Sequence, residues 1–345
     1  NGDRMTVRVA IMGFGRIGRN IFRALYPRND LEVVAINDIA SPQAMEYLLR
    51  YDSLHGRFEE PVRIMDGYLY AKGKRIPILH YREPGEIPWY DYGTDVVVEA
   101  TGRFRAREEL QKHLDMGADR VILSTPPVDE IDVVYIHGVS KGRVGREHRI
   151  ISCGSSTANC TMVMLKVLDD AFGVETGFFT SVHAYTAEQS LIDVPSSIDL
   201  RLSRAAVENI VPLHSWTRKG VERFFPKLKG RFGGYKLNVP VPDVSCVDLV
   251  TVLPQEVTVP EVTEVFRSAA GSHLKQVLSF AEEPIVSSDM LGSSASCTFD
   301  SLTTMVVSGN MLKTLGWYDQ GGGLSHRIVD VIAQLAPPRL QVGSS

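Results

Sequence analysis

The first forty residues contain a strand, a glycine-rich turn and a helix in direct succession. Residues 6–11 alternate and then run apolar, which predicts a strand buried on both faces of a parallel sheet. The strand ends at a turn with three glycines, and the apolar residues after it recur with helical spacing. The turn consists of Gly13, Phe14, Gly15, Arg16, Ile17 and Gly18. This order of elements predicts an α/β fold for the first part of the chain.

A second apolar strand, residues 33–36, ends next to Asp38, which lies about 20 residues beyond the last glycine of the turn. Glycines in such a turn permit a tight bend, close approach of the backbone to a pyrophosphate, and tight packing of helix against strand. A carboxylate at Asp38 would accept hydrogen bonds from ribose hydroxyls and repel a 2'-phosphate. The glycine pattern alone is compatible with a purely structural turn. With the flanking strands and the acid, it predicts a dinucleotide site that prefers NAD over NADP.

The alternation of strand and helix continues further along the chain. Residues 95–99 and 120–123 are predicted strands, and a helix is predicted between them at about 107–116. Thr101, Gly102 and Ser124 follow the carboxyl ends of these two strands, where open α/β sheets bind their ligands. We therefore expect these three residues to contact the cofactor, with an ordinary loop as the alternative interpretation.

Composition limits the partners and the location of the protein. With 345 residues, of which 44% are hydrophobic, the chain has room for two domains with buried cores. A net charge of -4 gives no broad basic field, so neither nucleic acid nor a membrane surface is an expected partner. The sequence has no apolar run long enough to cross a bilayer and no apolar core of a secretory signal near its start, so we expect a cytoplasmic protein. The four cysteines and the scattered histidines lack metal-site or disulfide spacing, so we expect reduced thiols and no metal. Residues before Met5 and the tail after Pro338 are expected to lie outside the fold.

Seven motifs, in this order along the chain, resemble those of the glyceraldehyde-3-phosphate dehydrogenase family. They are residues 11–19 (IMGFGRIGR), 34–38 (VAIND), 51–58 (YDSLHGRF), 99–104 (EATGRF), 152–160 (SCGSSTANC), 183–189 (HAYTAEQ) and 317–319 (WYD). Residues 147–149 (EHR) and 220–226 (GVERFFP) also resemble the erythrose-4-phosphate dehydrogenase branch of that family. The resemblance extends from Met5 to about Ala333.

The resemblance implies an NAD-binding Rossmann domain at 5–155 and an α+β catalytic domain at 156–321 with a mixed, mostly antiparallel sheet. It also implies a C-terminal helix at about 322–337 that packs back on the first domain. The residues agree, because strand-like runs at 178–184, 246–253, 304–308 and 312–318 lack regular helices between most of them. A long polar loop at about 184–204 resembles the segment that packs across subunits in homotetramers of the family; a plain surface loop is the alternative.

Ser156 occupies the position of the family's nucleophilic cysteine, and His183 corresponds to its catalytic histidine. In the chemistry that the resemblance implies, a thiolate at a helix start attacks an aldehyde, hydride passes to the nicotinamide, and phosphate cleaves the thioester. A helix N-terminus and an imidazole stabilise a thiolate but leave a serine hydroxyl protonated. Cys160 is expected to be a structural thiol, and Cys153 is the other thiol that could reach the nicotinamide. His183 is expected to act as general base and to polarise the carbonyl, with a hydrogen-bonded core residue as the alternative.

Other positions of the family's binding sites also differ in this chain. Glu188 stands where a threonine contacts the substrate phosphate, Asn238 where an arginine does, and Trp216 where a glycine lies near the attacking phosphate. Gln320 replaces the asparagine that holds the nicotinamide amide. The first two changes make the local charge more negative, so a dianionic substrate should bind more weakly. One anion site can survive near the helix start, because the matching residues there are Ser155, Thr157, Thr186, Arg201 and Ser215.

Three functions are compatible with these residues. The first is NAD-dependent oxidation of a small polyhydroxy or phosphorylated aldehyde, with serine at 156 in place of a native cysteine and inorganic phosphate as a possible second substrate. The second is a natural serine variant that transfers hydride to or from a carbonyl directly, with His183 as acid and base. The third is an NAD-binding sensor or scaffold without catalysis. Turnover by a cysteine variant at position 156 distinguishes the first from the others.

Overall fold

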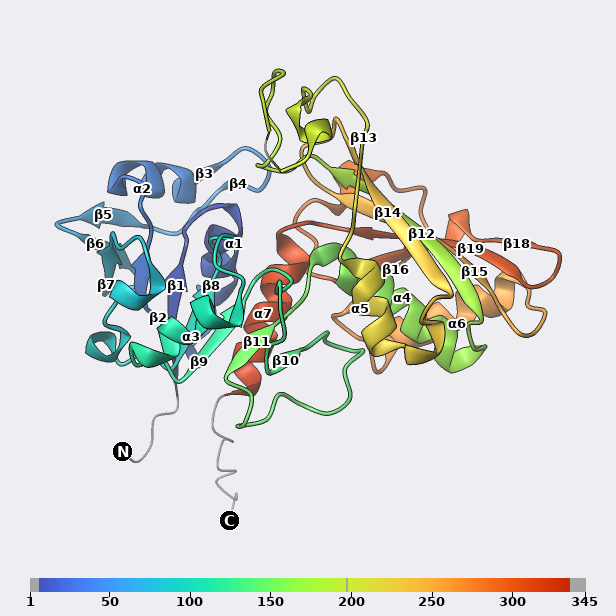
Figure 1. Ribbon diagram of the computed structural model, residues 1–345, viewed down its shortest axis with the longest axis horizontal. Helices are drawn as coiled ribbons and strands as arrows, with labels where there is room; N and C mark the ends of the chain where they lie inside the picture. Colours follow the sequence, from blue (N-terminus) through green and yellow to red (C-terminus); the bar gives the residue numbers. More distant parts are fainter. Residues whose placement is uncertain (1–5, 197, 336–345) are drawn as a thin grey trace, which may run out of the picture. The chain divides into compact units, whose positions relative to one another are not determined.

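The computed structural model describes residues 6–196 and 198–335, which form two compact units. The first unit comprises residues 6–135, 141–154 and 325–335, and the second comprises residues 136–140 and the described residues from 155 to 324. Each unit is built on one large β-sheet, as Figure 1 shows.

The sheet of the first unit has nine strands in the order β10-β11-β9-β8-β1-β2-β7-β6-β5, and the seven from β10 to β7 are parallel. The last two strands complete an antiparallel edge. The strands are β1 (Val7–Met12), β2 (Leu31–Asn37), β5 (Arg63–Met65), β6 (Tyr68–Ala71), β7 (Lys74–Leu79), β8 (Val96–Glu99), β9 (Arg120–Leu123), β10 (Val133–Val134) and β11 (Ile150–Ser152). β3 (Tyr51–Asp52) and β4 (Gly56–Arg57) form a separate hairpin. The apolar runs of β1 and β8 are buried because these strands lie in the middle of the sheet.

Three helices of the first unit connect its strands: α1 (Arg16–Leu25), α2 (Pro42–Arg50) and α3 (Arg107–Asp115). α1 turns Ile21, Phe22 and Leu25 toward the core, which explains their helical spacing. α2 begins after Ser41, whose hydroxyl accepts the N–H of Ala44 at 3.3 Å. Two short 3-10 helices, Pro84–Glu86 and Trp89–Tyr92, precede β8.

The sheet of the second unit follows the order β13-β14-β12-β15-β19-β17-β16, and β18 pairs with β19. Five of its seven pairings are antiparallel; β12 with β14 and β16 with β17 are parallel. The strands are β12 (Thr176–Ala184), β13 (Val211–Leu213), β14 (Phe232–Val239), β15 (Ser245–Val252), β16 (Leu278–Ala281), β17 (Cys297–Asp300), β18 (Met305–Val307) and β19 (Met311–Tyr318).

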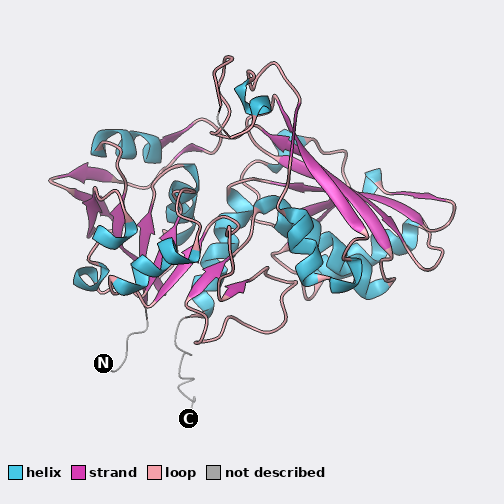
Figure 2. Cartoon of the chain, in the orientation of Figure 1, coloured by secondary structure: helices cyan, strands magenta, loops and turns pink. Residues whose placement is uncertain are grey.

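The helices of the second unit are α4 (Ser156–Ala171), α5 (Thr217–Phe224) and α6 (Val259–Gly271). α4 contacts β15, β17 and β19 as well as both other helices, and Figure 2 shows the three helices together along the sheet. Most of α4 is buried, which requires its long apolar run from Met162 to Leu165. Short 3-10 helices occur at Leu200–Ser203, Pro226–Leu228, Ser287–Met290 and Ser301–Thr303.

The predicted fold class is confirmed: a largely parallel, helix-connected sheet and a mixed, mostly antiparallel one. All four strand-like runs predicted in the second half are strands, namely β12, β15, β18 and β19. The predicted last helix is α7 (Gly322–Gln334), whose residues from Ser325 group with the first unit. Its predicted end at 336–337, residues 1–5 and the tail after Pro338 lie outside the described residues. Among the described helices, none has the length and apolar character to cross a bilayer.

Candidate active site

Two glycines of the turn after β1 are required by close backbone contacts. Gly13 has φ 91°, and a Cβ placed on it would lie 2.7 Å from the backbone nitrogen of Thr101. A Cβ on Gly18 would lie 2.0 Å from the carbonyl oxygen of Gly13, so α1 can start here only without a side chain. At Gly15 a Cβ would meet nothing within 4 Å, which leaves that side of the helix N-terminus accessible to a ligand. The turn therefore has the shape that a pyrophosphate needs.

A pocket of about 290 Å³ adjoins this turn. Gly13, Gly15, Asp38 and Thr101, all predicted cofactor residues, contribute to its lining. Asp38 accepts the N–H of Phe14 at 2.5 Å with one carboxylate oxygen and that of Ala40 at 2.8 Å with the other. Each oxygen retains a lone pair that can accept a ribose hydroxyl. Arg16, Ile17, Gly18, Gly102 and Ser124, which were also predicted, are outside the lining of this pocket.

A chain of buried side chains supports the pocket at Thr101. Glu99, completely buried, accepts the N–H of Thr101 at 2.8 Å and also the Thr101 hydroxyl. Its other oxygen lies 3.3 Å from His113 Nε2, and Trp89 Nε1 donates to His113 Nδ1 at 3.0 Å. An indole N–H only donates, so the imidazole carries its proton on Nε2 and donates it to Glu99. We call these four residues the acid network. The spacing of these four residues in the sequence does not indicate that they form a network.

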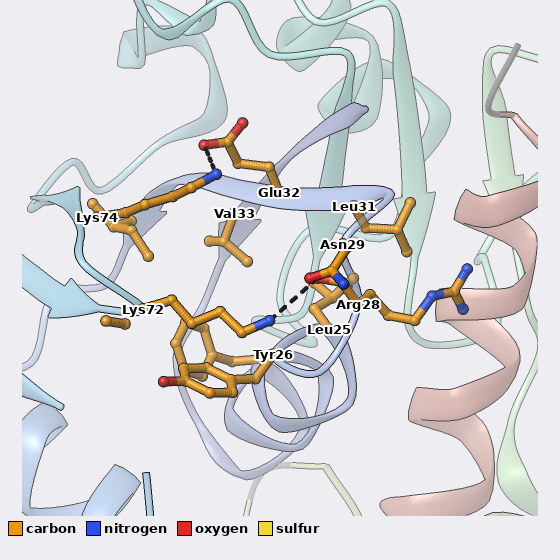
Figure 3. Close-up of a pocket in the computed structure, with 12 residues that line it drawn as sticks. Leu25, Tyr26, Arg28, Asn29, Leu31, Glu32, Val33, Lys72 and Lys74 are labelled. Carbon is orange, nitrogen blue, oxygen red and sulfur yellow. Dashed lines mark hydrogen bonds and ion pairs between the residues drawn. The ribbon is translucent and has the colours of Figure 1, made fainter. Parts of the chain in front are cut away.

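A second pocket of the first unit, about 270 Å³, is shown in Figure 3. Leu31, Glu32 and Val33, at the start of β2, contribute to its lining, whereas Asp38 follows the end of that strand. Lys72 donates to the carbonyl oxygen of Arg28 at 3.4 Å and lies over the ring of Tyr26, and Lys74 pairs with Glu32 at 2.6 Å. Both lysines already interact with groups of this unit, Lys72 with the turn after α1 and Lys74 with Glu32. None of the predicted site residues lines the pocket. It is therefore not part of the candidate site.

In the second unit, the start of α4 carries Ser156. Ser155 caps the helix by accepting the N–H of Ala158 at 3.2 Å, and the partly exposed Ser156 is the first helical residue. The hydroxyl of the next residue, Thr157, lies 2.7 Å from the hydroxyl of Tyr318. Ser156 is thus held at the positive end of a long helix.

His183 lies near the end of β12, on the face of the sheet that meets α4. Ser181, two residues earlier and therefore on the same face, lies 2.9 Å from the Tyr318 hydroxyl that also binds Thr157. His183 Nδ1 lies 2.7 Å from the carbonyl oxygen of Ala184, which can only accept, so this nitrogen carries the proton. The other ring nitrogen, Nε2, is then unprotonated in the neutral imidazole. The Tyr318 hydroxyl links the start of α4 to the strand of His183.

Gln320, predicted to bind the cofactor, is buried next to His183. Its amide nitrogen donates to the carbonyl oxygen of Ala184 at 3.1 Å and to the hydroxyl of Ser245 at 3.2 Å. Because that nitrogen also lies 3.2 Å from His183 Nδ1, the amide packs against the imidazole. This arrangement gives Gln320 a part in orienting His183 that the sequence does not indicate.

Three polar residues form a group beside His183, at the carboxyl ends of β12 and β14. Asn238 is in register with His183, completely buried, and donates its amide hydrogen to Gln189 Oε1. The N–H of Thr186 donates to the same oxygen at 3.3 Å. We call Thr186, Gln189 and Asn238 the open cluster, because each has a buried polar atom without a partner among the described residues. Thr186 and Asn238 were predicted from the resemblance; Gln189 was not given a role.

Three other predicted substrate residues, Arg201, Ser215 and Trp216, have contacts near them in the second unit. Arg201, in the short helix Leu200–Ser203, donates to the carbonyl oxygen of Pro212 at 3.1 Å. Ser215 donates to the hydroxyl of Thr217 at 3.0 Å. Trp216 precedes α5, and its ring would lie 2.6 Å from a Cβ on Gly220. These contacts fix the segment before α5 and explain the glycine at position 220.

Comparison with known proteins identifies the family of the chain. Residues 7–107 match the glyceraldehyde 3-phosphate dehydrogenase NAD binding domain, and residues 152–320 match the C-terminal domain of the same enzyme. The glyceraldehyde-3-phosphate dehydrogenase of Geobacillus stearothermophilus is 45% identical over 333 residues, which cover 96% of this chain and 99% of the relative. Glyceraldehyde-3-phosphate dehydrogenase 1 of Bacillus cereus is 43% identical over 329 residues (95% and 98%), and the Streptomyces coelicolor enzyme is 44% identical over 330 (95% and 98%).

The chain belongs to the glyceraldehyde-3-phosphate dehydrogenase family. The predicted family, oxidoreductase class and NAD cofactor are thereby confirmed. The turn at Gly13 and the carboxylate of Asp38 fit that cofactor. Glycines let the backbone approach a pyrophosphate closely, and the carboxylate can accept hydrogen bonds from ribose hydroxyls. When bound there, NAD supplies the hydride acceptor of an oxidoreductase.

The thiols of this family member are all buried. Burial raises the pKa of Cys153 in the first unit to about 12 and has the same effect on Cys246 in the second. Burial also raises the pKa of Cys160, and the nearby thiol of Cys297 raises it further. Cys153, Cys160 and Cys246 are therefore protonated at neutral pH, which is the opposite of what a nucleophile needs.

Proposed function

We propose that this family member oxidises a small polyhydroxy or phosphorylated aldehyde with NAD as the oxidant. The observation that supports this most directly is the shared Tyr318 hydroxyl, which brings the start of α4 and the strand of His183 together. A nucleophile at position 156 and a base at 183 are the two groups that aldehyde oxidation requires in this family's chemistry.

In the covalent route, position 156 carries a cysteine. His183 Nε2 takes the proton of the thiol. The thiolate, stabilised by the α4 N-terminus, then forms a bond to the aldehyde carbon, and the carbonyl oxygen takes that proton from Nε2. That proton returns to His183 as the carbon loses hydride and becomes a thioester. Phosphate then displaces the thiolate and leaves as an acyl phosphate. Serine at 156 stops this route at its first step, because its hydroxyl stays protonated.

Ser156 itself favours a second candidate, direct hydride transfer. Here no bond to the chain forms: His183 Nε2 accepts the hydroxyl proton of an alcohol or of an aldehyde hydrate as the carbon loses hydride. The hydrogen bond from Nδ1 to Ala184 holds the imidazole in the tautomer that this step needs. The reaction then requires no phosphate.

The deciding experiment compares the Ser156 protein with Ser156→Cys and Ser156→Ala on a panel of aldehydes, with and without phosphate or arsenate. We expect NADH formation by Ser156→Cys to exceed that of both others by at least about 1,000-fold, as found when other covalent nucleophiles are restored or removed. His183→Ala in the Ser156→Cys background should lower kcat by about 100-fold or more.

Each alternative has its own outcome in that experiment. Phosphate-independent turnover by the Ser156 protein, unchanged in Ser156→Ala, supports direct hydride transfer. NAD binding without turnover by any variant contradicts both enzymatic routes and supports a binding protein.

We also propose that the protein works as a homotetramer in the cytoplasm. The loop after β12 exposes large apolar side chains, with Ile192 71%, Ile198 77% and Leu200 84% accessible, which is unusual unless another surface covers them. The four cysteines form no disulfide in the part of the chain that the structure describes, which favours a reducing compartment. Light scattering after size-exclusion chromatography measures the mass directly, and a monomer at micromolar concentration contradicts the assembly.

A further inference from the structure

The open cluster leaves three polar atoms for a ligand. They are Thr186 Oγ1, Gln189 Nε2 and Asn238 Oδ1, all buried and without a partner within residues 6–196 and 198–335. Gln189 is 9% exposed and Asn238 is fully buried. Buried polar atoms are almost always paired, and three exceptions in contacting residues beside His183 indicate a site that something else completes.

The orientation of both amides follows from one backbone donor. The N–H of Thr186 points at Gln189, so the atom it meets at 3.3 Å must be the amide oxygen. Asn238 contacts that same oxygen and must therefore present its NH₂ group to it. Gln189 Nε2 is consequently a donor to the ligand, and Asn238 Oδ1 is an acceptor.

Two residues of opposite charge, Lys236 and Glu188, are close in the chain to residues of the open cluster. Lys236 lies two residues before Asn238 on the same face of β14 and in register with Ser181. Burial lowers the pKa of Lys236, and the carboxylate of Glu188 acts in the opposite direction. The Glu188 carboxylate offsets the charge of Lys236, so Lys236 attracts a dianion less than an isolated cation would.

We propose that the open cluster binds hydroxyl groups of an uncharged polyhydroxy aldehyde, and that it selects against a phosphate at this position. A hydroxyl accepts from Gln189 Nε2 and donates to Asn238 Oδ1, and Thr186 can do either. A phosphate dianion has no proton for Asn238 Oδ1 and would leave that acceptor buried against negative oxygen. This inference rests on the proposed aldehyde chemistry at His183 and narrows its substrate class.

The test measures binding to the Ser156 protein with saturating NAD, by calorimetry. D-glyceraldehyde and propanal have the same carbon chain and differ in two hydroxyls. We expect D-glyceraldehyde to bind at least about 100-fold more tightly, since sites built for a hydroxyl reject analogues that lack it. D-glyceraldehyde 3-phosphate should bind no more tightly than D-glyceraldehyde.

Variants assign the selectivity to the cluster. Asn238→Leu and the nearly isosteric Thr186→Val should each reduce the ratio of the two dissociation constants to below about 10, with the NAD dissociation constant unchanged. Asn310→Leu is the matched control, because Asn310 also donates a side-chain bond, to Leu253 at 3.1 Å, but lies at the turn before β19. It should keep the full ratio.

Two results overturn the proposal: an equal affinity for D-glyceraldehyde and propanal, as for a cluster that holds only water, or tighter binding of the phosphate ester by more than about tenfold. Failure of the proposed function is a different result. In that case Ser156→Cys gives no NADH with any aldehyde, while the binding ratio and its loss in Asn238→Leu are still observed.

Discussion

The acid network of the first unit and the open cluster of the second are both buried and polar, but they differ in completeness. In the acid network every donor meets an acceptor, from the indole of Trp89 to the N–H of Thr101. In the open cluster one donor, one acceptor and one hydroxyl remain. A complete network fixes the backbone that a cofactor contacts, whereas an incomplete one reserves its hydrogen bonds for a substrate.

The largest expected effect comes from breaking the complete network. In Glu99→Gln the single amide oxygen can serve Thr101 or His113 but not both, and the indole of Trp89 prevents the imidazole from changing tautomer. We expect a loss of about 2–3 kcal/mol in the free energy of unfolding. The exposed Glu108→Gln should change it by less than about 0.5 kcal/mol.

The matched change in the open cluster should behave differently. Asn238→Leu removes an acceptor that already lacks a partner, together with a donor to Gln189 Oε1. That oxygen keeps the N–H of Thr186, so the cost in urea unfolding should be about 1 kcal/mol. Equal losses in Glu99→Gln and Asn238→Leu contradict the distinction between the two sites.

Asp38 lies between these two cases, because it binds backbone N–H groups and also lines the cofactor pocket. We expect Asp38→Ala to weaken NAD binding about tenfold, the value of one lost charged hydrogen bond of about 1.4 kcal/mol. Asp38→Asn keeps the shape without the charge, so it should retain more of the NAD affinity and lose discrimination against NADP. Fluorescence titration with both nucleotides measures this; unchanged discrimination in both variants means that Asp38 serves only the turn.

The elements predicted from sequence are those with local signals. The glycine turn, Asp38 and the start of α4 each occur within one short stretch whose spacing determines its geometry. β14 was missed because its sequence, FGGYKLNV, has two glycines and no clear alternation, and with it the place of Lys236 beside Asn238 was missed.

The acid network could not be predicted for a related reason. Trp89, Glu99 and His113 come from a 3-10 helix, a strand and a helix, and only the packing of these elements brings them together. The resemblance gave Thr186 and Asn238 as substrate residues. Their unpaired atoms depend on side-chain orientations that a sequence does not contain.

A buried ionisable group of the first unit, the thiol of Cys153, should make the free energy of unfolding depend on pH. Burial raises its pKa to about 12, while in the unfolded chain a thiol titrates near 8.5. The folded state therefore binds the proton more tightly, and the stabilisation is complete below about pH 8.5 and is lost as the pH rises toward 12. Between pH 8 and 9.5 this thiol should account for about 1 kcal/mol of the fall in unfolding free energy.

Cys153→Ala should remove that part of the pH dependence, whereas Val134→Ala, a buried truncation without a titrating group, should lower stability equally at both pH values. Parallel pH profiles for Cys153→Ala and the unaltered chain would show that the thiol is solvated in the folded protein, and the first unit would then also contain an incompletely buried polar site.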